Sequence, residues 1–253
     1  MILVISDVHL GYEESNKDDF SKFLDKSETL DIDHLVLLGD FFDFWRFDNA
    51  QIMIENEDIL EKLYNLNAKN IHYIVGNHDY YMLYLSERYG DNFPFTISKN
   101  LRLEDGGNNF YFMHGYEFEV LSLDPMTLDM YEEFSEKMCY SGKTIGGIAG
   151  QVWDWIQGSD LKEKMEMTPF KRFELSEEPE KLYNLATSNG KSFLLGMKPD
   201  EILVFGHTHD PFITNDKKVV NAGSWVNELP KKEDQNSYVE ISEGKIELKY
   251  FKF

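Results

Sequence analysis

The most constraining feature of this chain is a strand-to-loop pattern that occurs five times. In each case a run of apolar and β-branched residues ends abruptly, and side chains that can bind a metal or carry a proton follow at once. The clearest case is the run 71–75, which is followed by Gly76-Asn77-His78-Asp79. A short apolar run bounded by glycine predicts a buried strand that ends in a tight turn. In open α/β sheets, ligands bind at the carboxyl ends of the strands.

The other four strands with this pattern carry the same kinds of side chain into their loops. They are residues 2–5 before Asp7 and His9, 35–38 before Asp40, 110–113 before His114, and 202–205 before His207 and His209. Five of the seven histidines therefore stand at strand ends. A lone histidine at such a place is usually structural or merely exposed, but five of them among Asp and Asn are hard to explain as packing. We expect the strands to bring these side chains to one edge.

The order of elements before residue 100 predicts a largely parallel sheet. Amphipathic helices are expected over 18–30 and 52–66, and they alternate with the strands 2–5, 35–38 and 71–75. This β-α-β-α-β order gives parallel strands that are joined by right-handed crossovers.

The remainder of the chain is also rich in expected strands. A hairpin is predicted over 101–113, with its turn at Gly106-Gly107-Asn108-Asn109. Further strands are expected near 202–205, 212–214, 218–221, 236–241 and 245–252. Alternation of apolar and charged residues in the last of these predicts a half-exposed strand near a sheet edge. We therefore expect an α/β (α+β) fold, a sandwich of two β-sheets flanked by helices.

Residues 117–198 interrupt this β-rich pattern. Apolar and aromatic side chains recur there at helical spacing: Met130, Tyr131, Phe134 and Met138, then Ile148, Val152, Trp155 and Ile156. We expect a mainly helical cap, inserted into a core that is made of residues 1–116 and 199–253. Most of these aromatic residues are expected to pack the cap onto the core; the alternative is a lid whose apolar inner face holds part of a substrate.

Composition limits the classes of partner. The chain has 253 residues, 46 acidic and 25 basic, and a net charge of −21. Such a surface repels nucleic-acid phosphates and anionic membranes, although metal ions can reverse the field at a site. No apolar run approaches the roughly 18–20 residues that span a membrane. Met1 leads directly into the first strand, so no signal peptide is expected, and a single cysteine, Cys139, fits a reducing cytosol.

The polar residues of the loops are expected to form a cage for metal ions. Asp7 and His9 are two positions apart, so on an extended chain their side chains point to the same side. His207 and His209 repeat this spacing. Together with a further Asp, Asn and His, the two pairs offer more ligands than one zinc ion needs. Two metal ions that share a carboxylate are the economical solution.

Five motifs in this order resemble the calcineurin-like metallophosphoesterase superfamily. They are Asp7-x-His9, Gly39-Asp40-x-x-Asp43, Gly76-Asn77-His78-Asp79, His114-Gly115 and Gly206-His207-Thr208-His209. The match covers residues 1–116 and about 199–226. Each motif alone is weak, but all five in order are a strong signal. The resemblance implies a two-sheet sandwich with a dinuclear metal centre at the strand ends.

The resemblance also implies a role for each residue. One metal ion would be held by Asp7, His9 and His209, the other by Asn77, His114 and His207, and both by the bridging Asp40. His78 resembles the proton donor of the family. Asp79 would orient His78, and Asp43 would fix its own loop.

The implied reaction is hydrolysis of a phosphomonoester or phosphodiester of a small molecule. A hydroxide that bridges two divalent ions attacks phosphorus, because the ions lower the pKa of water towards neutrality. His78 would donate a proton to the leaving oxygen, a contribution of roughly 10²–10⁴-fold in rate. Imidazole, carboxylate and amide ligands suit manganese, iron or zinc, and the hard oxygen of Asn77 favours manganese.

Three alternatives stay open. The stretch 39–45 and the helical insertion resemble the UDP-diacylglucosamine pyrophosphohydrolase branch, which cleaves a lipid-linked nucleotide diphosphate but usually has arginine in place of His78. The stretch 6–12 is similar to double-strand-break repair nucleases, which usually carry a DNA-capping domain that this chain lacks. A non-catalytic scaffold ranks last, because loss of ligands would be its signature and none is lost here. The oligomeric state is left open.

Three other features are not expected to take part in the chemistry. Residues 141–144 look like the end of a phosphate-binding loop, but the leading glycine is missing, since position 137 is lysine, and a helix precedes them. A basic cluster over 162–172 is interleaved with glutamates, which is typical of a solvated face. Cys139 lies within a helical pattern and is expected to be an inert thiol.

Overall fold

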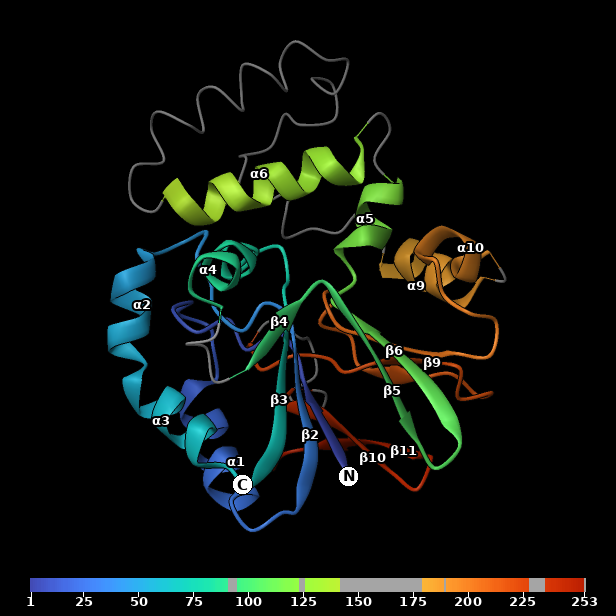
Figure 1. Ribbon diagram of the computed structural model, residues 1–253, viewed down its shortest axis with the longest axis horizontal. Coiled ribbons are helices and arrows are strands. Elements are labelled where there is room, and N and C mark those ends of the chain that lie inside the picture. Colours follow the sequence, from blue (N-terminus) through green and yellow to red (C-terminus); the bar gives the residue numbers. More distant parts are fainter. Residues whose placement is uncertain (91–94, 123–125, 142–178, 189, 228–234, 253) are drawn as a thin grey trace.

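Two mixed β-sheets lie face to face, with helices on their outer faces and across one end (Figure 1). This computed structural model describes residues 1–90, 95–122, 126–141, 179–188, 190–227 and 235–252. The expected sandwich of two sheets flanked by helices is confirmed.

The first sheet has six strands in the order β11-β10-β1-β2-β3-β4. They are β1 (Ile2–Ile5), β2 (Ile32–Leu38), β3 (Ala68–Ile74), β4 (Thr96–Ser98), β10 (Ser237–Ser242) and β11 (Lys245–Tyr250). Strands β1 to β4 are parallel, as the β-α-β order predicts, whereas β10 pairs antiparallel with both β1 and β11. β11 lies at the edge of the sheet, in agreement with its alternating sequence.

The second sheet has five strands in the order β5-β6-β7-β9-β8. They are β5 (Asn100–Asp105), β6 (Asn108–Met113), β7 (Ile202–Phe205), β8 (Phe212–Ile213) and β9 (Val219–Asn221). β5 and β6 form the expected hairpin, and its turn places Gly106 and Gly107 at positive φ, which glycine adopts without steric cost. β6, β7 and β9 run parallel, so the carboxyl ends of β6 and β7 lie at the same end of the sheet.

Helices cover both outer faces of the sandwich (Figure 1). The first sheet is flanked by α1 (Lys17–Ser27), α2 (Asn49–Glu55) and α3 (Glu57–Asn65), and the second by α9 (Pro179–Thr187) and α10 (Lys191–Leu195). Towards one end of the strands lie α4 (Tyr81–Tyr89), α5 (Tyr116–Ser122) and α6 (Leu128–Ser141). No helix among the described residues is long and apolar enough to cross a membrane.

Two details of the helices differ from the sequence-based expectations. The single helix predicted over 52–66 is wrong, because the backbone leaves helical geometry at Asn56, whose side-chain amide donates to the Ile52 carbonyl at 2.7 Å. The sequence patterns predict neither α4 nor β4. In α4 only Met82 is buried, so the helix has little apolar periodicity to detect.

Strands β1, β7 and β9 are buried along their whole length, and β7 shows the reason, because each of its faces meets a different layer. In β7, Ile202 and Val204 face the interior between the two sheets, whereas Leu203 and Phe205 pack with residues of α5 and α9. This explains why the strand is an unbroken apolar run rather than an alternating one. The loop that follows such a strand starts from a firmly held position.

The described parts of residues 117–198 are mainly helical and comprise α5, α6, α9 and α10. The rest of the predicted cap, residues 123–125, 142–178 and 189, lies outside the described residues. So do the phosphate-loop look-alike beyond Ser141 and the basic cluster over 162–172. The division of the chain into a core and a cap therefore stays a prediction.

Candidate metal centre

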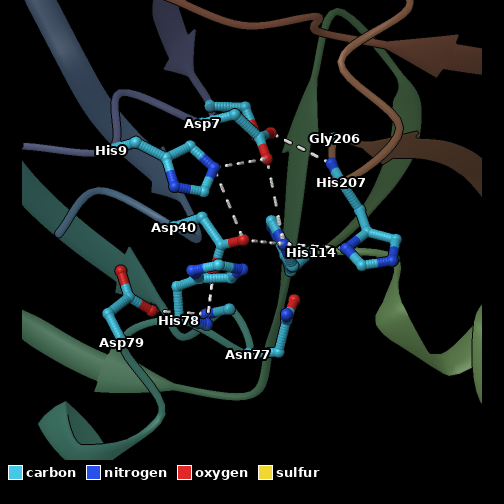
Figure 2. A network of polar contacts seen from close by, with 12 residues as sticks. Asp7, His9, Asp40, Asn77, His78, Asp79, His114, Gly206 and His207 are labelled. Carbon is cyan, nitrogen blue, oxygen red and sulfur yellow. Dashed lines mark hydrogen bonds and ion pairs between the residues drawn. The ribbon is translucent and has the colours of Figure 1, made fainter. Parts of the chain in front are cut away.

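The polar side chains that follow five strands gather in one place (Figure 2). β1, β2 and β3 of the first sheet supply part of this cluster, and β6 and β7 of the second sheet supply the rest. The expected convergence is therefore present, but the side chains come from two sheets rather than from a single sheet edge. The cluster contains Asp7, His9, Asp40, Asn77, His78, His114, His207 and His209.

One group within the cluster consists of Asp7, His9 and His209. The Nε2 atoms of His9 and His209 lie 3.3 Å apart, and Asp7 Oδ1 lies 3.3 Å from His209 Nε2. Asp7 Oδ1 is also 3.8 Å from His9 Nε2. The three side chains thus point candidate ligand atoms at a common point, within 4.8 Å of one another.

A second group consists of Asp40, His114 and His207. His114 Nε2 lies 3.3 Å from His207 Nδ1 and 3.1 Å from Asp40 Oδ2. The same Asp40 Oδ2 is 3.7 Å from His9 Nε2 in the first group, while Asp40 Oδ1 accepts a hydrogen bond from the His78 backbone N–H at 2.8 Å. One carboxylate oxygen is therefore anchored to the backbone, and the other lies between the two groups.

The outward-facing ring nitrogens of three histidines also have partners. His9 Nδ1 lies 3.2 Å from Asp43 Oδ2, His114 Nδ1 lies 2.9 Å from the Leu38 carbonyl, and His207 Nε2 lies 3.0 Å from Glu119 Oε2. In each case a proton on the outward nitrogen leaves the inward nitrogen free to act as a ligand. Metal-binding histidines usually donate their second N–H to such acceptors.

The backbone at these loops adopts a conformation that is uncommon outside glycine. Positive φ angles occur at Asp7 (52°), His9 (49°), Asp40 (49°), His207 (66°) and His209 (60°). The reason given for the convergence of Asp7 and His9, an extended chain, is therefore wrong, because left-handed turns aim the side chains instead. Such conformations cost about 1–3 kcal/mol each and persist where the surroundings impose them, often at functional sites.

Electrostatics ties the buried acids to the histidines. Burial would raise the pKa of the Asp7 carboxyl, but the charge of His114 and contacts with His209 and His9 hold it well below its ordinary value. Burial would likewise lower the pKa of His114, yet Asp40 and Asp7 raise it to about 10. The carboxylates of Asp7, Asp40 and Asp43 are buried, so their negative charge must be balanced by positive charge nearby. Protons on the histidines or metal cations can supply it.

The residues fit a metal centre on a separate structural ground. Asp7 Oδ1 and Asn77 Oδ1 are buried and accept no hydrogen bond. Buried polar atoms are nearly always hydrogen-bonded, so two orphaned acceptors beside facing imidazoles are unusual. Imidazole nitrogen, carboxylate oxygen and amide oxygen together suit divalent transition metals.

His78 is held at the margin of the cluster by contacts on several sides. Its Nδ1 lies 3.1 Å from Asp43 Oδ1, and its ring stacks on Trp45 with centroids 4.2 Å apart at 20°. Its carbonyl accepts a hydrogen bond from the Cys139 thiol at 3.2 Å. Burial raises the pKa of that thiol well above its ordinary value, which agrees with an unreactive cysteine.

The expected parts of Asp79 and Asp43 are exchanged in the structure. Asp79 accepts hydrogen bonds from the backbone N–H groups of Gly76 and Phe41, each at 2.7 Å, and from the Tyr73 hydroxyl. It therefore fixes two loops, and the expectation that it orients His78 is wrong. Asp43, expected only to fix its loop, contacts both His9 and His78.

Sequence reasoning missed Glu119 and the stacking of Trp45. Trp45 lies in an aromatic stretch whose role the sequence leaves open. Glu119 has no signal in its spacing, since its contact with His207 joins α5 to the loop after β7, 88 positions away. A contact of that kind is created only by the packing of α5.

This architecture defines a class of protein, the metal-dependent phosphoester hydrolases. A two-sheet sandwich carries adjoining groups of Asp and His at its strand ends, and the carboxylate of Asp40, from one group, lies close to His9 of another. The chain belongs to the calcineurin-like phosphoesterase family, whose model matches residues 1–211. The resemblance seen in the five motifs is thereby confirmed.

Individual relatives match almost the whole chain. The UDP-2,3-diacylglucosamine hydrolase of Shewanella baltica (strain OS185) is 26% identical over 268 residues, which cover 99% of this chain and 97% of that protein. Its counterpart in Shewanella halifaxensis is 24% identical over 255 residues, or 97% of this chain and 96% of that protein. The crystal structure of a dimetal phosphatase from Danio rerio has a TM-score of 0.50 and 13% identity; the match covers 98% of this chain and 94% of that one and shows the shared fold.

Proposed function

We propose that the cluster is a dinuclear metal centre with Asp40 as its bridge. Asp7, His9 and His209 would hold one divalent ion, and Asn77, His114 and His207 the other. The observation that carries this assignment is two pairs of facing imidazoles, His9–His209 and His114–His207, each with ring nitrogens 3.3 Å apart. Asp40 Oδ2 lies 3.7 Å from His9 Nε2 and 3.1 Å from His114 Nε2, so it approaches both pairs. The orphaned oxygens of Asp7 and Asn77 support it.

Manganese is the proposed native metal, with iron or zinc as the alternatives. The hard amide oxygen of Asn77 and the carboxylates favour manganese, while the imidazoles suit all three. When bound, two such ions supply Lewis acidity to phosphoryl oxygens and lower the pKa of a water towards neutrality. The protein holds the donor atoms in place through the hydrogen bonds described above.

His78 is the proposed proton donor to the leaving oxygen. Asp43 accepts the proton of Nδ1, so Nε2 is the nitrogen that can hold and release a proton at the reacting group. Stacking on Trp45 limits rotation of the ring. General acid catalysis by a group held in this way contributes roughly 10²–10⁴-fold in rate.

The proposed substrate is a phosphate ester of a small molecule in the cytosol. The net charge of −21 opposes binding of nucleic acid, whose affinity rests largely on Lys and Arg contacts with phosphates. The single cysteine fits a reducing compartment.

A second candidate substrate is a lipid-linked nucleotide diphosphate. Two observations favour it: the relatives named UDP-2,3-diacylglucosamine hydrolase, and a cavity of about 620 Å³ beside α5, α6 and α10. The apolar part of the cavity lining includes Met113, Val120, Leu121, Leu128 and Leu194. This cavity could receive an apolar chain.

Hydrolysis assays with metal-stripped protein test the proposal. The protein would be re-supplied with Mn²⁺ and given p-nitrophenyl phosphate, bis-p-nitrophenyl phosphate, UDP-2,3-diacylglucosamine or single-stranded DNA. Metal-dependent turnover of a chromogenic ester supports the phosphoesterase, and a strong preference for the lipid-linked substrate supports the second candidate. Cleavage of DNA alone would overturn both substrate proposals. Failure to bind any metal would overturn the metal centre.

A further inference from the structure

His207 reaches outward to a helix as well as inward to the cluster. Its Nδ1 lies 3.3 Å from His114 Nε2, and its Nε2 lies 3.0 Å from Glu119 Oε2 in α5. The side chains of His207 and Glu119 are only 8% and 9% exposed, so solvent does not compete strongly for this contact.

Glu119 belongs to a reciprocal pair of hydrogen bonds between α5 and α6. Tyr131 of α6 donates to Glu119 Oε2 at 3.2 Å, and Tyr116 of α5 donates to Glu132 Oε1 at 3.0 Å. The two tyrosine rings stack with centroids 5.7 Å apart at 17°. The two glutamates thus have the same kind of helix partner and equal burial, each 7% exposed as a residue.

The two glutamates differ in their second partner. Glu132 Oε2 lies 2.6 Å from Lys99 Nζ, which makes an ion pair away from the cluster. Glu119 instead meets His207, a candidate ligand. Each glutamate therefore accepts a hydrogen bond from a tyrosine of the other helix. Glu132 also forms an ion pair with Lys99, whereas Glu119 lies beside the proposed metal centre.

We propose that Glu119 is a positioning residue for the second metal ion. It would hold the His207 ring with Nδ1 towards the ion, and Tyr131 would hold Glu119 in turn. This inference rests on the proposed assignment of His207 as a ligand. A carboxylate behind a metal-binding histidine fixes the ring and raises its basicity, and loss of such a partner typically lowers metal affinity by about 10–100-fold. The α5–α6 pair would then support the metal centre and not merely cover it.

Metal titration of the full-length, metal-stripped protein tests this role directly. Free Mn²⁺ would be followed by electron paramagnetic resonance for the wild type, Glu119→Ala, Glu119→Gln and Glu132→Gln. We expect Glu119→Ala to weaken one of two sites by roughly 10–100-fold and leave the other unchanged. Glu119→Gln should weaken the same site less, because its amide oxygen still accepts the Nε2 proton. Glu132→Gln should bind both ions as the wild type does.

Activity provides a second readout that a purely structural role would not move. The Mn²⁺ concentration for half-maximal activity should rise in Glu119→Ala, while kcat at saturating Mn²⁺ stays near that of the wild type. Wild-type affinity at both sites in the two Glu119 variants would overturn the inference, as would an equal loss in Glu132→Gln. If Glu119→Ala does not fold, Glu119→Gln decides the matter by the same criterion. A wild-type protein that binds fewer than two ions would instead overturn the proposed metal centre.

Discussion

Two groups of histidines in this protein have opposite surroundings. Five lie at the strand ends in the metal-centre cluster, whereas His34 of β2 and His72 of β3 lie within neighbouring strands of the first sheet. His34 Nδ1 and His72 Nε2 are 2.9 Å apart, and the rings stack at 5.2 Å. Both groups therefore contain imidazole nitrogens within about hydrogen-bonding distance of each other.

The two groups differ in whether buried carboxylates contact the histidines and in the backbone conformation of the loops that carry them. Burial would lower the pKa of His9, but Asp43, Asp7 and Asp40 raise it to about 10. In the other pair burial lowers the pKa of both His34 and His72. A histidine pair alone therefore does not distinguish the candidate metal centre; buried acids, orphaned oxygens and left-handed loops do.

Removing the central carboxylate should have the largest effect. Asp40→Asn takes away the negative charge that lies between the two groups, so metal-dependent activity should fall to the level of the metal-stripped protein. Hydrolysis of the chromogenic esters with and without Mn²⁺ measures this. Asp33→Asn, in the strand that precedes Asp40 but bonded to Lys69 and the N-terminus, is the control and should retain activity. Substantial metal-dependent activity in Asp40→Asn would contradict the bridging role.

Removing the proposed proton donor should have the next largest effect. His78→Ala should lower kcat by roughly 10²–10⁴-fold and leave both metal ions bound, because only the general acid is lost. Steady-state kinetics and metal analysis of the same preparation give the two numbers. His72→Ala, from the other group, serves as the control. An unchanged kcat, with chemistry shown to limit the rate, would rule out this role for His78.

Replacing Asp43 or Asp79, one acid from each of two loops, should separate the orientation of the histidines from the support of the loops. Asp43→Asn should weaken metal binding at the Asp7–His9–His209 group by roughly 10–100-fold, because Asp43 supports His9, and should lower kcat through His78. Asp79→Asn should mainly reduce thermal stability, since Asp79 accepts hydrogen bonds from backbone N–H groups of both loops and from the Tyr73 hydroxyl. Equal metal affinity in Asp43→Asn and the wild type would contradict the orienting role.

The smallest expected effect concerns the pH dependence of stability at the His34–His72 pair. Both folded-state pKa values lie below the ordinary value of 6.5, so the unfolded chain binds protons more readily. Stability from this source is present above about pH 6.5 and is lost as the pH falls through the folded-state pKa values. Because both rings are partly exposed, solvent screening should keep this loss small.

Urea unfolding at pH 7.5 and 5.5 measures this loss for the wild type and for a His34→Gln/His72→Gln variant. All other titratable groups are the same in the two proteins, so the difference between their losses of stability isolates the pair. We expect a shallower decline in the double variant. Identical declines would show that the pair does not contribute.

Most of the fold could be predicted because its strands are short apolar runs with polar loops. β1 and β7 agree with their predicted ranges, and the hairpin β5–β6 agrees with its glycine turn. The strand β4 and the helix α4 could not be predicted, since β4 has three residues and α4 buries little of its surface. The break at Asn56 depends on one side-chain hydrogen bond that a periodic pattern does not reveal.

Much of the candidate site could be predicted too, but not the reasons for its geometry. The order of the motifs identifies the eight cluster residues, whereas the partners of His78 and Asp79 depend on how two loops pack. Because Asp7 and His9 are two positions apart, an extended backbone is expected there, yet both residues have positive φ. Backbone hydrogen bonds between loops impose that conformation, for example from Asp7 N–H to the Gly39 carbonyl at 3.1 Å.

The sequence by itself determined the family, the sandwich and the set of donor atoms, because these depend on residue types and on their order after apolar runs. Only the tertiary structure decided which atoms meet. It placed Asp40 between two groups that each combine residues from both sheets, gave Asp43 rather than Asp79 to His78, and set Glu119 behind His207. Such contacts join residues far apart in the chain, and they arise from the packing of layers, which no local pattern encodes.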